Sequence, residues 1–140
     1  MTYLATALVA DDDMAARVAA HQSRRPGTWC TVEASTGLQD ALASIQGTVL
    51  VDSLGTWLVA HHDFEADDEG LVAALKARRG DTIVVSEEVG LGVHPETALG
   101  RLFRDRLGEV NQAVARAADR VLLVVAGRAL DLAQAEQLLP

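Results

Sequence analysis

The regular alternation of short apolar runs with longer stretches of helical periodicity constrains the fold more than any other feature of this sequence. The apolar runs are consecutive Val, Leu and Ile residues, which is typical of strands whose two faces are both covered by helices. Strands that alternate with helices indicate a mostly parallel sheet with right-handed crossovers, and therefore a three-layer α/β fold. The predicted strands are 2–9, 28–34, 48–53, 81–88 and the last buried strand, 120–127; the predicted helices are 11–25, 36–44, 54–62, 67–80, 95–119 and 130–139.

The composition fits one such domain, spanning residues 1–140. With 140 residues, 49% of them hydrophobic, the chain is long enough to bury a substantial core. The net charge of −8 argues against a general binder of nucleic acids or membrane surfaces. Cys30 is the single cysteine, so we expect no internal disulfide and a reducing, cytoplasmic location. Because no apolar run reaches transmembrane length, we also expect neither a membrane span nor a signal peptide.

The ends of the predicted strands are the expected place for a ligand, because parallel α/β sheets bind ligands at the carboxyl ends of their strands. These ends are residues 6–8, 52–53, 86–88 and 126–127. Asp52 ends the run VLVD, where a carboxylate can hold Mg²⁺ on a nucleotide, but it is equally compatible with an N-cap of the following helix. Glu33 suits hydrogen bonds from a ribose or a guanine edge, although a solvated strand carboxylate is the commoner case.

The stretch MAARVAAHQSRRP combines a histidine with arginines at helical spacing. Met14, Val18 and His21 share one helix face, and Arg24 and Arg25 follow within a turn. A neutral imidazole is a nucleophile toward phosphorus, and guanidinium groups bind phosphate oxygens, so the cluster suits phosphoryl or nucleotidyl transfer. The alternative is a histidine at a helix end that interacts with the helix dipole, beside solvated arginines. Spacing alone favours this alternative.

Other motifs carry weaker signals. The segment 86–96 follows a strand and contains two glycines, so it is either a ligand-lining loop or a connection that leads into a helix beginning at Pro95. The segment 61–63, His-His-Asp, has no third ligand at suitable spacing, so a metal site there is not favoured. Cys30 has no evident base partner and is expected to be inert. The only lysine, Lys76, lies in AALKARRG, so these 140 residues contain no G-x-x-x-x-G-K-[ST] phosphate-binding loop.

Taken together, these segments resemble the bifunctional adenosylcobinamide kinase/adenosylcobinamide-phosphate guanylyltransferase family of cobalamin biosynthesis. The resemblance runs through TYLATA, MAARVAAHQSRRP, VLVDSLGTWL and the long stretch from VVSEEVGLGVHP to VLLVVAG, in the family's order. It implies a P-loop nucleoside triphosphatase fold of the RecA-like type. It also implies two reactions, phosphorylation of adenosylcobinamide by a nucleoside triphosphate and transfer of GMP from GTP to the product, giving adenosylcobinamide-GDP.

The resemblance also implies roles for particular residues. His21 matches the histidine that carries GMP, and this favours the functional interpretation of the cluster over the helix-end alternative. The guanine nucleotide is then contacted by residues on several segments, with Asp52 holding Mg²⁺ as well; these residues are Thr6, Ala7, Leu8, Gln22, Ser23, Arg24, Arg25, Glu33 and Asp52. The implied ligands are GTP, ATP, Mg²⁺, adenosylcobinamide and its phosphate, and the family's assemblies imply a homo-oligomer.

One departure from the family pattern is large. Family members begin with a strand, a glycine-rich loop ending in Gly-Lys-Ser and a helix, whereas here Met1 directly precedes the TYLATA strand. The expected causes are a start assigned too late, a truncated paralogue that only binds nucleotide or corrinoid, or a first strand and helix supplied by another polypeptide. Because the remaining motifs look undecayed, we favour the first. We expect these 140 residues to lack kinase activity and to retain at most weak guanylyl transfer.

Overall fold

A computed structural model describes residues 1–8 and 12–134 of the protein, with the backbone alone described for residues 12–14, 17, 21 and 22. The strands are β1 (Thr2–Ala5), β2 (Cys30–Glu33), β3 (Val49–Asp52), β4 (Thr82–Val85), β5 (Leu122–Val125) and β6 (Arg128–Asp131). The helices are α1 (Asp12–Ser23), α2 (Leu38–Ser44), α3 (Leu54–Val59), α4 (Asp68–Ala77) and α5 (Ala98–Ala117), with short 3-10 turns η1 (His62–Phe64) and η2 (Val89–Leu91). Within the described ranges, each helix is too short or too polar to span a lipid bilayer.

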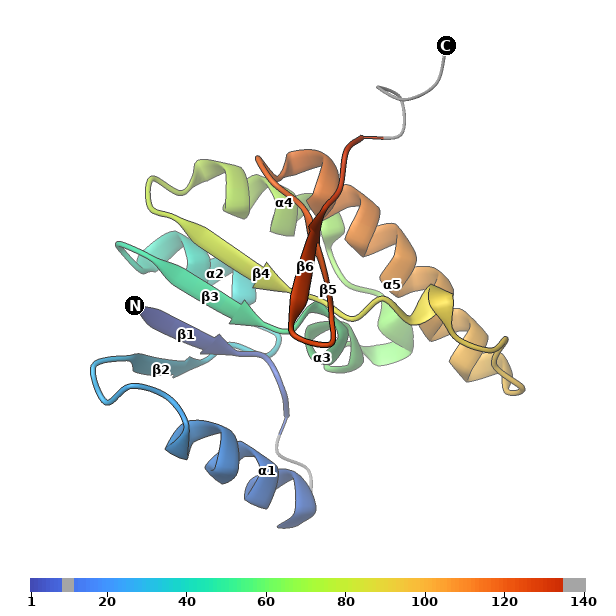
Figure 1. Cartoon of the computed structure of the whole chain (residues 1–140), viewed down its shortest axis with the longest axis horizontal. Coiled ribbons are helices and arrows are strands. Elements are labelled where there is room, and N and C mark those ends of the chain that lie inside the picture. Colours follow the sequence, from blue (N-terminus) through green and yellow to red (C-terminus); the bar gives the residue numbers. More distant parts are fainter. Residues whose placement is uncertain (9–11, 135–140) are drawn as a thin grey trace.

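Four of the strands form one parallel sheet in the order β2-β1-β3-β4 (Figure 1). Tyr3 is paired in register with Thr31 of β2 and with Leu50 of β3, and Leu50 is paired in turn with Ile83 of β4. The predicted α/β class with a parallel sheet is therefore confirmed, and the arrangement is consistent with a P-loop nucleoside triphosphatase-like fold.

The main core lies between one face of this sheet and the helices α2 to α5. Leu4, Val49 and Val51 point into it from the strands and are almost completely buried. Trp57 of α3 and Leu107 of α5 are fully buried in the same cluster. Helices α2 and α4, α4 and α5, and α3 and α5 contact one another, so they form one continuous layer behind the sheet (Figure 1).

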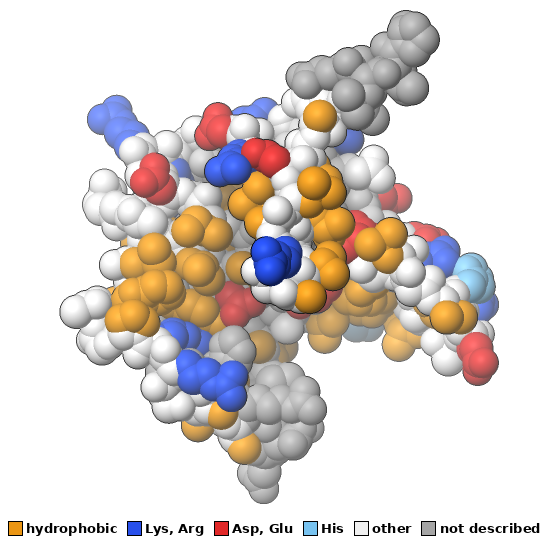
Figure 2. Space-filling model, in the orientation of Figure 1, with side chains coloured by type: hydrophobic (Ala, Val, Ile, Leu, Met, Phe, Trp, Pro, Cys, Tyr) orange, Lys and Arg blue, Asp and Glu red, His pale blue; other side chains and the backbone are white. Residues whose placement is uncertain are grey.

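The opposite face of the sheet differs from the expectation of two covered faces. Ile83 and Val85 alternate with Val84 along β4, and these two residues are 47% and 39% exposed. Figure 2 shows hydrophobic side chains gathered on this side of the molecule, in front of the strands. In the described part of the chain, helices α2 to α5 all lie on the core side of the sheet. The apolar side chains on the opposite side of β4 are therefore exposed.

The run 120–127 was predicted to be the last buried strand of the parallel sheet, and this prediction is wrong. Its central residues form β5, which pairs antiparallel with β6 in a separate two-stranded sheet. Ala126 and Gly127 connect the two strands with positive φ angles of 51° and 71°, the geometry of a tight hairpin turn. The predicted helix 130–139 is likewise wrong at its start, because Leu130 and Asp131 belong to β6; residues 135–139 lie outside the described ranges.

Side-chain caps set the starts of the longer helices. Asp67 accepts a hydrogen bond from the amide of Gly70 at the start of α4, and Thr97 accepts one from the amide of Gly100 at the start of α5. The second cap corrects the predicted start at Pro95, because Thr97 lies two residues further along the chain and the helix begins after it. Arg78, which follows α4, donates to the carbonyls of Leu42, Ile45 and Gly47 and so satisfies the end of α2.

Candidate functional site

The carboxyl ends of β1, β3 and β4 meet at one edge of the sheet and supply a network of polar groups. Thr6, just after β1, is fully buried, and its hydroxyl donates to the carbonyl of Ser53 at 2.7 Å. The same hydroxyl lies 2.6 Å from that of Thr56 in α3. Three of the four predicted strand ends thus share this edge, whereas residues 126–127 form the β5–β6 turn and do not belong to it.

The junction between β3 and α3 tests one of the two interpretations of Asp52, namely that it is the N-cap of the following helix. Ser53, not Asp52, is the N-cap of α3, and its hydroxyl accepts a hydrogen bond from the amide of Thr56. The Thr56 hydroxyl accepts in return from the amide of Ser53 at 3.1 Å, which completes a capping box. The capping role suggested for Asp52 is therefore incorrect, and its half-buried carboxylate has a different partner.

That partner is Tyr3 on β1, a residue that the sequence pattern did not single out. The Tyr3 hydroxyl donates to Oδ2 of Asp52, and the ring is almost completely buried. Burial, followed by the hydrogen bond to Asp52 and the charge of that carboxylate, raises the pKa of Tyr3 to about 12. The phenol therefore stays protonated to a higher pH than a free tyrosine and donates to Asp52 over that range.

Arg25 lies over the ring face of the same tyrosine. Its guanidinium carbon is 3.2 Å from the centre of the Tyr3 ring, a cation–π contact, and its Nη1 donates to the hydroxyl of Thr31 at 3.1 Å. Figure 2 shows basic side chains between α1 and the exposed face of the sheet. The structure therefore brings Arg25 and Asp52 to one side chain, which is the only direct link it provides between the predicted arginine cluster and a strand end among the described residues.

The other predicted contacts of the nucleotide lie at varied positions. Ala7 is half-buried and Leu8 is exposed after β1, Glu33 is exposed at the end of β2, and Arg24 is exposed after α1. The hydroxyl of Ser23 donates to the carbonyl of Ala20 in its own helix. The predicted helix around His21 is present as α1, but the side chains of His21 and Gln22 lie outside the described set, so their roles stay predictions.

Glu87 is a further polar residue of this edge that the sequence analysis did not identify individually. Its Oε1 accepts from the Ser53 hydroxyl at 2.6 Å, and its Oε2 accepts from the amide of Gly55 at 3.0 Å. A Cβ atom at position 55 would lie 2.2 Å from Oε2, so a glycine is required for this close approach. The carboxylate of Glu87, which follows β4, thereby holds the β3–α3 junction next to Asp52 in place. In the sequence, the only signal for Glu87 was its position at the end of a predicted strand.

The remaining motifs lie at the following positions. The Nδ1 atom of His61 lies 2.9 Å from the Trp57 carbonyl, and its ring packs edge-on against the Trp57 ring. His62 pairs with Asp63 on the surface, and the described residues contain no group of three His, Cys, Asp or Glu side chains that could hold a metal. In the loop 86–96, Glu88 accepts from the amide of Gly90. Cys30 is exposed on β2.

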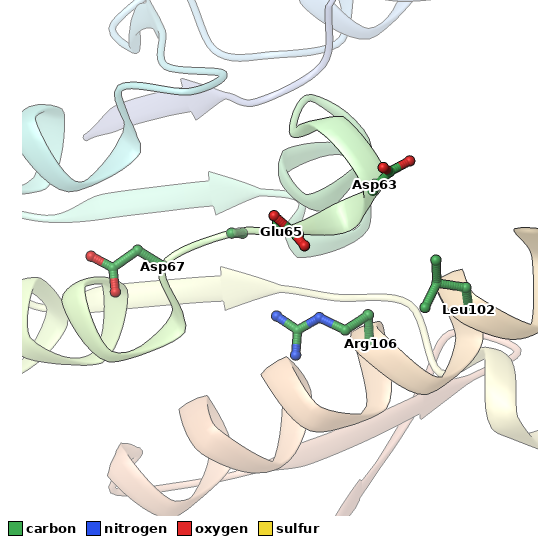
Figure 3. A pocket seen from close by; sticks show the side chains of 6 residues that line it. Asp63, Glu65, Asp67, Leu102 and Arg106 are labelled. Carbon is green, nitrogen blue, oxygen red and sulfur yellow. The ribbon is translucent and has the colours of Figure 1, made fainter.

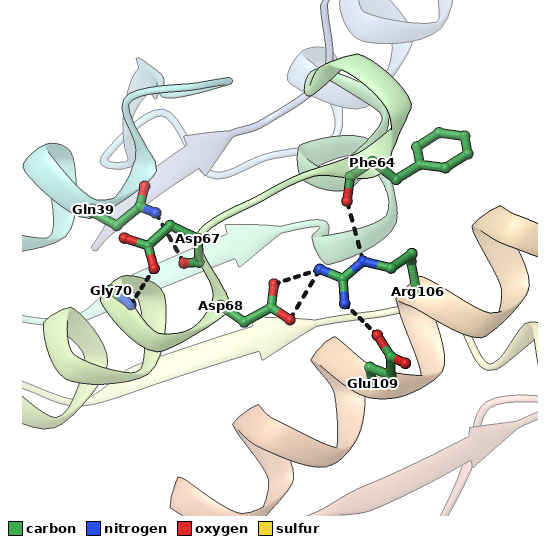
Figure 4. Close-up of polar contacts among 7 residues, drawn as sticks. All are labelled: Gln39, Phe64, Asp67, Asp68, Gly70, Arg106 and Glu109. Carbon is green, nitrogen blue, oxygen red and sulfur yellow. Dashed lines mark hydrogen bonds and ion pairs between the residues drawn. The ribbon is translucent and has the colours of Figure 1, made fainter.

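A hollow of about 700 Å³ lies elsewhere, between η1, the start of α4 and α5 (Figure 3). Arg106 lines it and donates to both oxygens of Asp68, to the carbonyl of Phe64 and to Glu109 (Figure 4). The bond to Glu109, together with the charges of both carboxylates, raises the pKa of Arg106. The guanidinium is thus committed to joining three segments, and we assign this hollow a structural role.

The sequence is similar to known proteins over most of its length. Residues 1–132 match the family CobU, described as cobinamide kinase / cobinamide phosphate guanyltransferase. The bifunctional adenosylcobalamin biosynthesis protein CobU of Salmonella typhimurium is 37% identical over 147 residues, which cover 89% of this chain and 81% of that protein. CobP of Pseudomonas aeruginosa is 36% identical, and the match covers 94% of this chain and 82% of that protein. CobU of Escherichia coli is 33% identical, and the match covers 89% of this chain and 81% of that protein. Both of these also carry the name bifunctional adenosylcobalamin biosynthesis protein.

Proposed function

The chain belongs to the cobinamide kinase / cobinamide phosphate guanyltransferase family, and on this premise we propose that it acts in the formation of adenosylcobinamide-GDP from adenosylcobinamide. The proposed substrates are GTP, a triphosphate such as ATP or GTP for the phosphorylation step, and adenosylcobinamide with its phosphate. Family membership does not favour the alternative of an inactive nucleotide- or corrinoid-binding module. We also propose a homo-oligomer in the cytoplasm, which light scattering and cell fractionation test.

The guanylyl-transfer step is proposed to run through His21. A ring nitrogen attacks the α-phosphorus of GTP, the bond from that phosphorus to the bridging oxygen breaks, and pyrophosphate leaves. A phosphate oxygen of adenosylcobinamide phosphate then attacks the same phosphorus and breaks its bond to nitrogen, which frees His21 and forms the diphosphate. Arg24 and Arg25 are proposed to bind phosphate oxygens, since guanidinium groups suit them, while Thr6, Ala7, Leu8, Gln22, Ser23 and Glu33 are proposed to contact the nucleotide.

Asp52 is proposed to hold the Mg²⁺ that accompanies the nucleotide. Its chemistry fits, because Mg²⁺ prefers carboxylate oxygens and is usually held in proteins by one or two of them together with substrate phosphates. The hydrogen bond from Tyr3 engages Oδ2 and keeps the carboxylate half-buried beside the strand ends. When bound, the cation offsets charge on the phosphate oxygens. The observation that carries the proposal is the meeting of Asp52 and Arg25 at Tyr3, which brings a cation ligand and a phosphate ligand to one place.

The test is covalent labelling with GTP that carries radioactive phosphorus in the α position. We expect label that is stable to alkali and labile to acid, as a phosphorus–nitrogen bond to histidine is, and we expect its loss in His21→Ala. His62→Ala is the matched control, because His62 is an exposed histidine that pairs with its neighbour Asp63. Full labelling of His21→Ala, or no labelling of the native protein, would contradict the proposal.

A further inference from the structure

We infer that Tyr3 is a positioning residue that keeps Arg25 and Asp52 apart, so that one positive and one negative group remain free for a nucleotide and its cation. The inference rests on the proposed function, because it assigns Arg25 to a phosphate and Asp52 to the cation. It adds a residue for which neither the family resemblance nor the strand-end pattern provides a role.

The geometry places the two charged groups on different parts of one side chain. The guanidinium of Arg25 lies over the ring face, 3.2 Å from its centre, and the carboxylate of Asp52 accepts from the hydroxyl at the ring's far end. Tyr3 and Asp52 point to the same face of the sheet, because Tyr3 is paired with Leu50 and Asp52 follows two residues later along β3. One buried phenol thus contacts a cation through its ring face and an anion through its hydroxyl.

The described residues contain no ion pair between Arg25 and Asp52, although both are half-buried on the same face of the sheet. Opposite charges in such a setting attract, so something must hold them in place. Arg25 is fixed by the ring and by its bond to Thr31, while its Nε atom is buried without a hydrogen-bond partner. That unused donor indicates an arginine that is held in position but incompletely satisfied.

Two substitutions of Tyr3 separate its two contacts. Tyr3→Phe keeps the ring under Arg25 but removes the donor to Asp52. Tyr3→Leu removes both contacts while leaving an apolar side chain at this buried position of β1. In the second variant we expect Arg25 and Asp52 to form a direct ion pair, which neutralises the two groups that the ligand requires.

The first arm of the experiment needs no ligand. Thermal unfolding of Arg25→Ala, Asp52→Asn and the double variant is compared in the native and Tyr3→Leu backgrounds as double-mutant cycles. Because both residues contact Tyr3, we expect a small non-additivity of Tm in the native background, and one larger by about 3 °C in the Tyr3→Leu background, where the new ion pair couples the two residues directly. The same coupling in both backgrounds would overturn the inference.

The second arm measures GTP binding by calorimetry, with Mg²⁺ and with EDTA. We expect Tyr3→Phe to weaken binding about fivefold in Mg²⁺ and to leave binding in EDTA unchanged, because only the Asp52 contact is lost. Tyr3→Leu is expected to weaken GTP binding both in Mg²⁺ and in EDTA. In an Asp52→Asn background, Tyr3→Phe is expected to have no further effect on GTP binding. Equal losses with and without Mg²⁺ in Tyr3→Phe would indicate a merely structural role and overturn the inference. A native protein that binds no GTP refutes the proposed function instead, and the ligand-free arm then still decides the role of Tyr3.

Discussion

Tyr3 is the only tyrosine in the chain, so its ionisation can be followed by the near-ultraviolet absorbance of tyrosinate without a second phenol in the signal. Its pKa is raised from 10.0 to about 12, mainly by burial, then by the hydrogen bond to Asp52 and by the charge of that carboxylate, while Arg25 opposes the shift. At about pH 11 a phenol of pKa 12 is roughly one tenth ionised, whereas an unperturbed one is roughly nine tenths ionised. The ionised fraction of Tyr3 at about pH 11 therefore distinguishes the native environment of the phenol from that of a free tyrosine.

Two substitutions are expected to move this titration in opposite directions. Asp52→Asn removes the negative charge beside the phenol, so the pKa of Tyr3 falls but stays above 10.0, because burial is the largest cause of the shift. Arg25→Ala removes a nearby positive charge, so the pKa of Tyr3 rises further. The assay is a pH jump in EDTA, read before unfolding, with Arg79→Ala as a distant control.

The same shift makes stability depend on pH in a defined window. Unfolded Tyr3 loses its proton near pH 10 and native Tyr3 near pH 12, so between these values the unfolded state binds fewer protons and rising pH favours unfolding. The contribution is complete below pH 10 and lost by pH 12. Two pKa units correspond to about 2.7 kcal/mol, and solvent near the hydroxyl reduces this to about 1–2 kcal/mol. Tyr3→Phe is expected to remove this loss of stability between pH 10 and pH 12. An unaltered dependence of stability on pH in Tyr3→Phe would refute the reasoning, and so would shifts of the Tyr3 pKa in the same direction in Asp52→Asn and Arg25→Ala.

Three further substitutions test other parts of the structure. Arg24→Ala is expected to weaken GTP binding about tenfold and Arg79→Ala to leave it unchanged, since only the former lies beside the predicted phosphate site; equal calorimetric effects would contradict that site. Arg78→Ala is expected to lower the free energy of unfolding by about 1.5–3 kcal/mol in urea titrations, because three carbonyls lose a charged donor, whereas Arg79→Ala changes it little. Gly55→Ala is expected to displace the exposed Glu87 side chain and to lower the free energy of unfolding by at most about 1 kcal/mol, and to cost less in a Glu87→Ala background; full additivity of the two substitutions would show that the clash is unimportant.

Much of the architecture follows from local patterns. The apolar runs around Leu4, Val51 and Val84 predict three neighbouring strands of the parallel sheet, because each is flanked by helical periodicity and ends in polar residues. The same reasoning fails for 120–127, since a run of Leu and Val indicates burial but not which strand it pairs with. The turn at 126–127 redirects it into a hairpin.

The candidate site was predictable to a similar extent. Asp52 was recognisable because a carboxylate ends a strand, a property of adjacent residues. The roles of Tyr3 and Glu87 were not recognisable, because they depend on register and on contacts over 49 and 34 residues along the sequence. An aromatic residue inside an apolar strand carries no sign of its hydrogen-bond partner until the neighbouring strand is in place.

The strand order has a consequence for how the protein folds. Strand β1 lies inside the sheet, yet both of its partners, β2 and β3, come later in the chain, at residues 30–33 and 49–52. During synthesis Thr2–Ala5 are therefore made before both of the described strands with which they pair, and the pairing is completed only after the second of these, β3, has been made. Pairings at such sequence separation are slow to form, because closing the loop has an entropic cost before the contacts stabilise it. We therefore expect the rate of folding to be limited by the docking of β1 between β2 and β3, and chaperone binding to be most important in that interval.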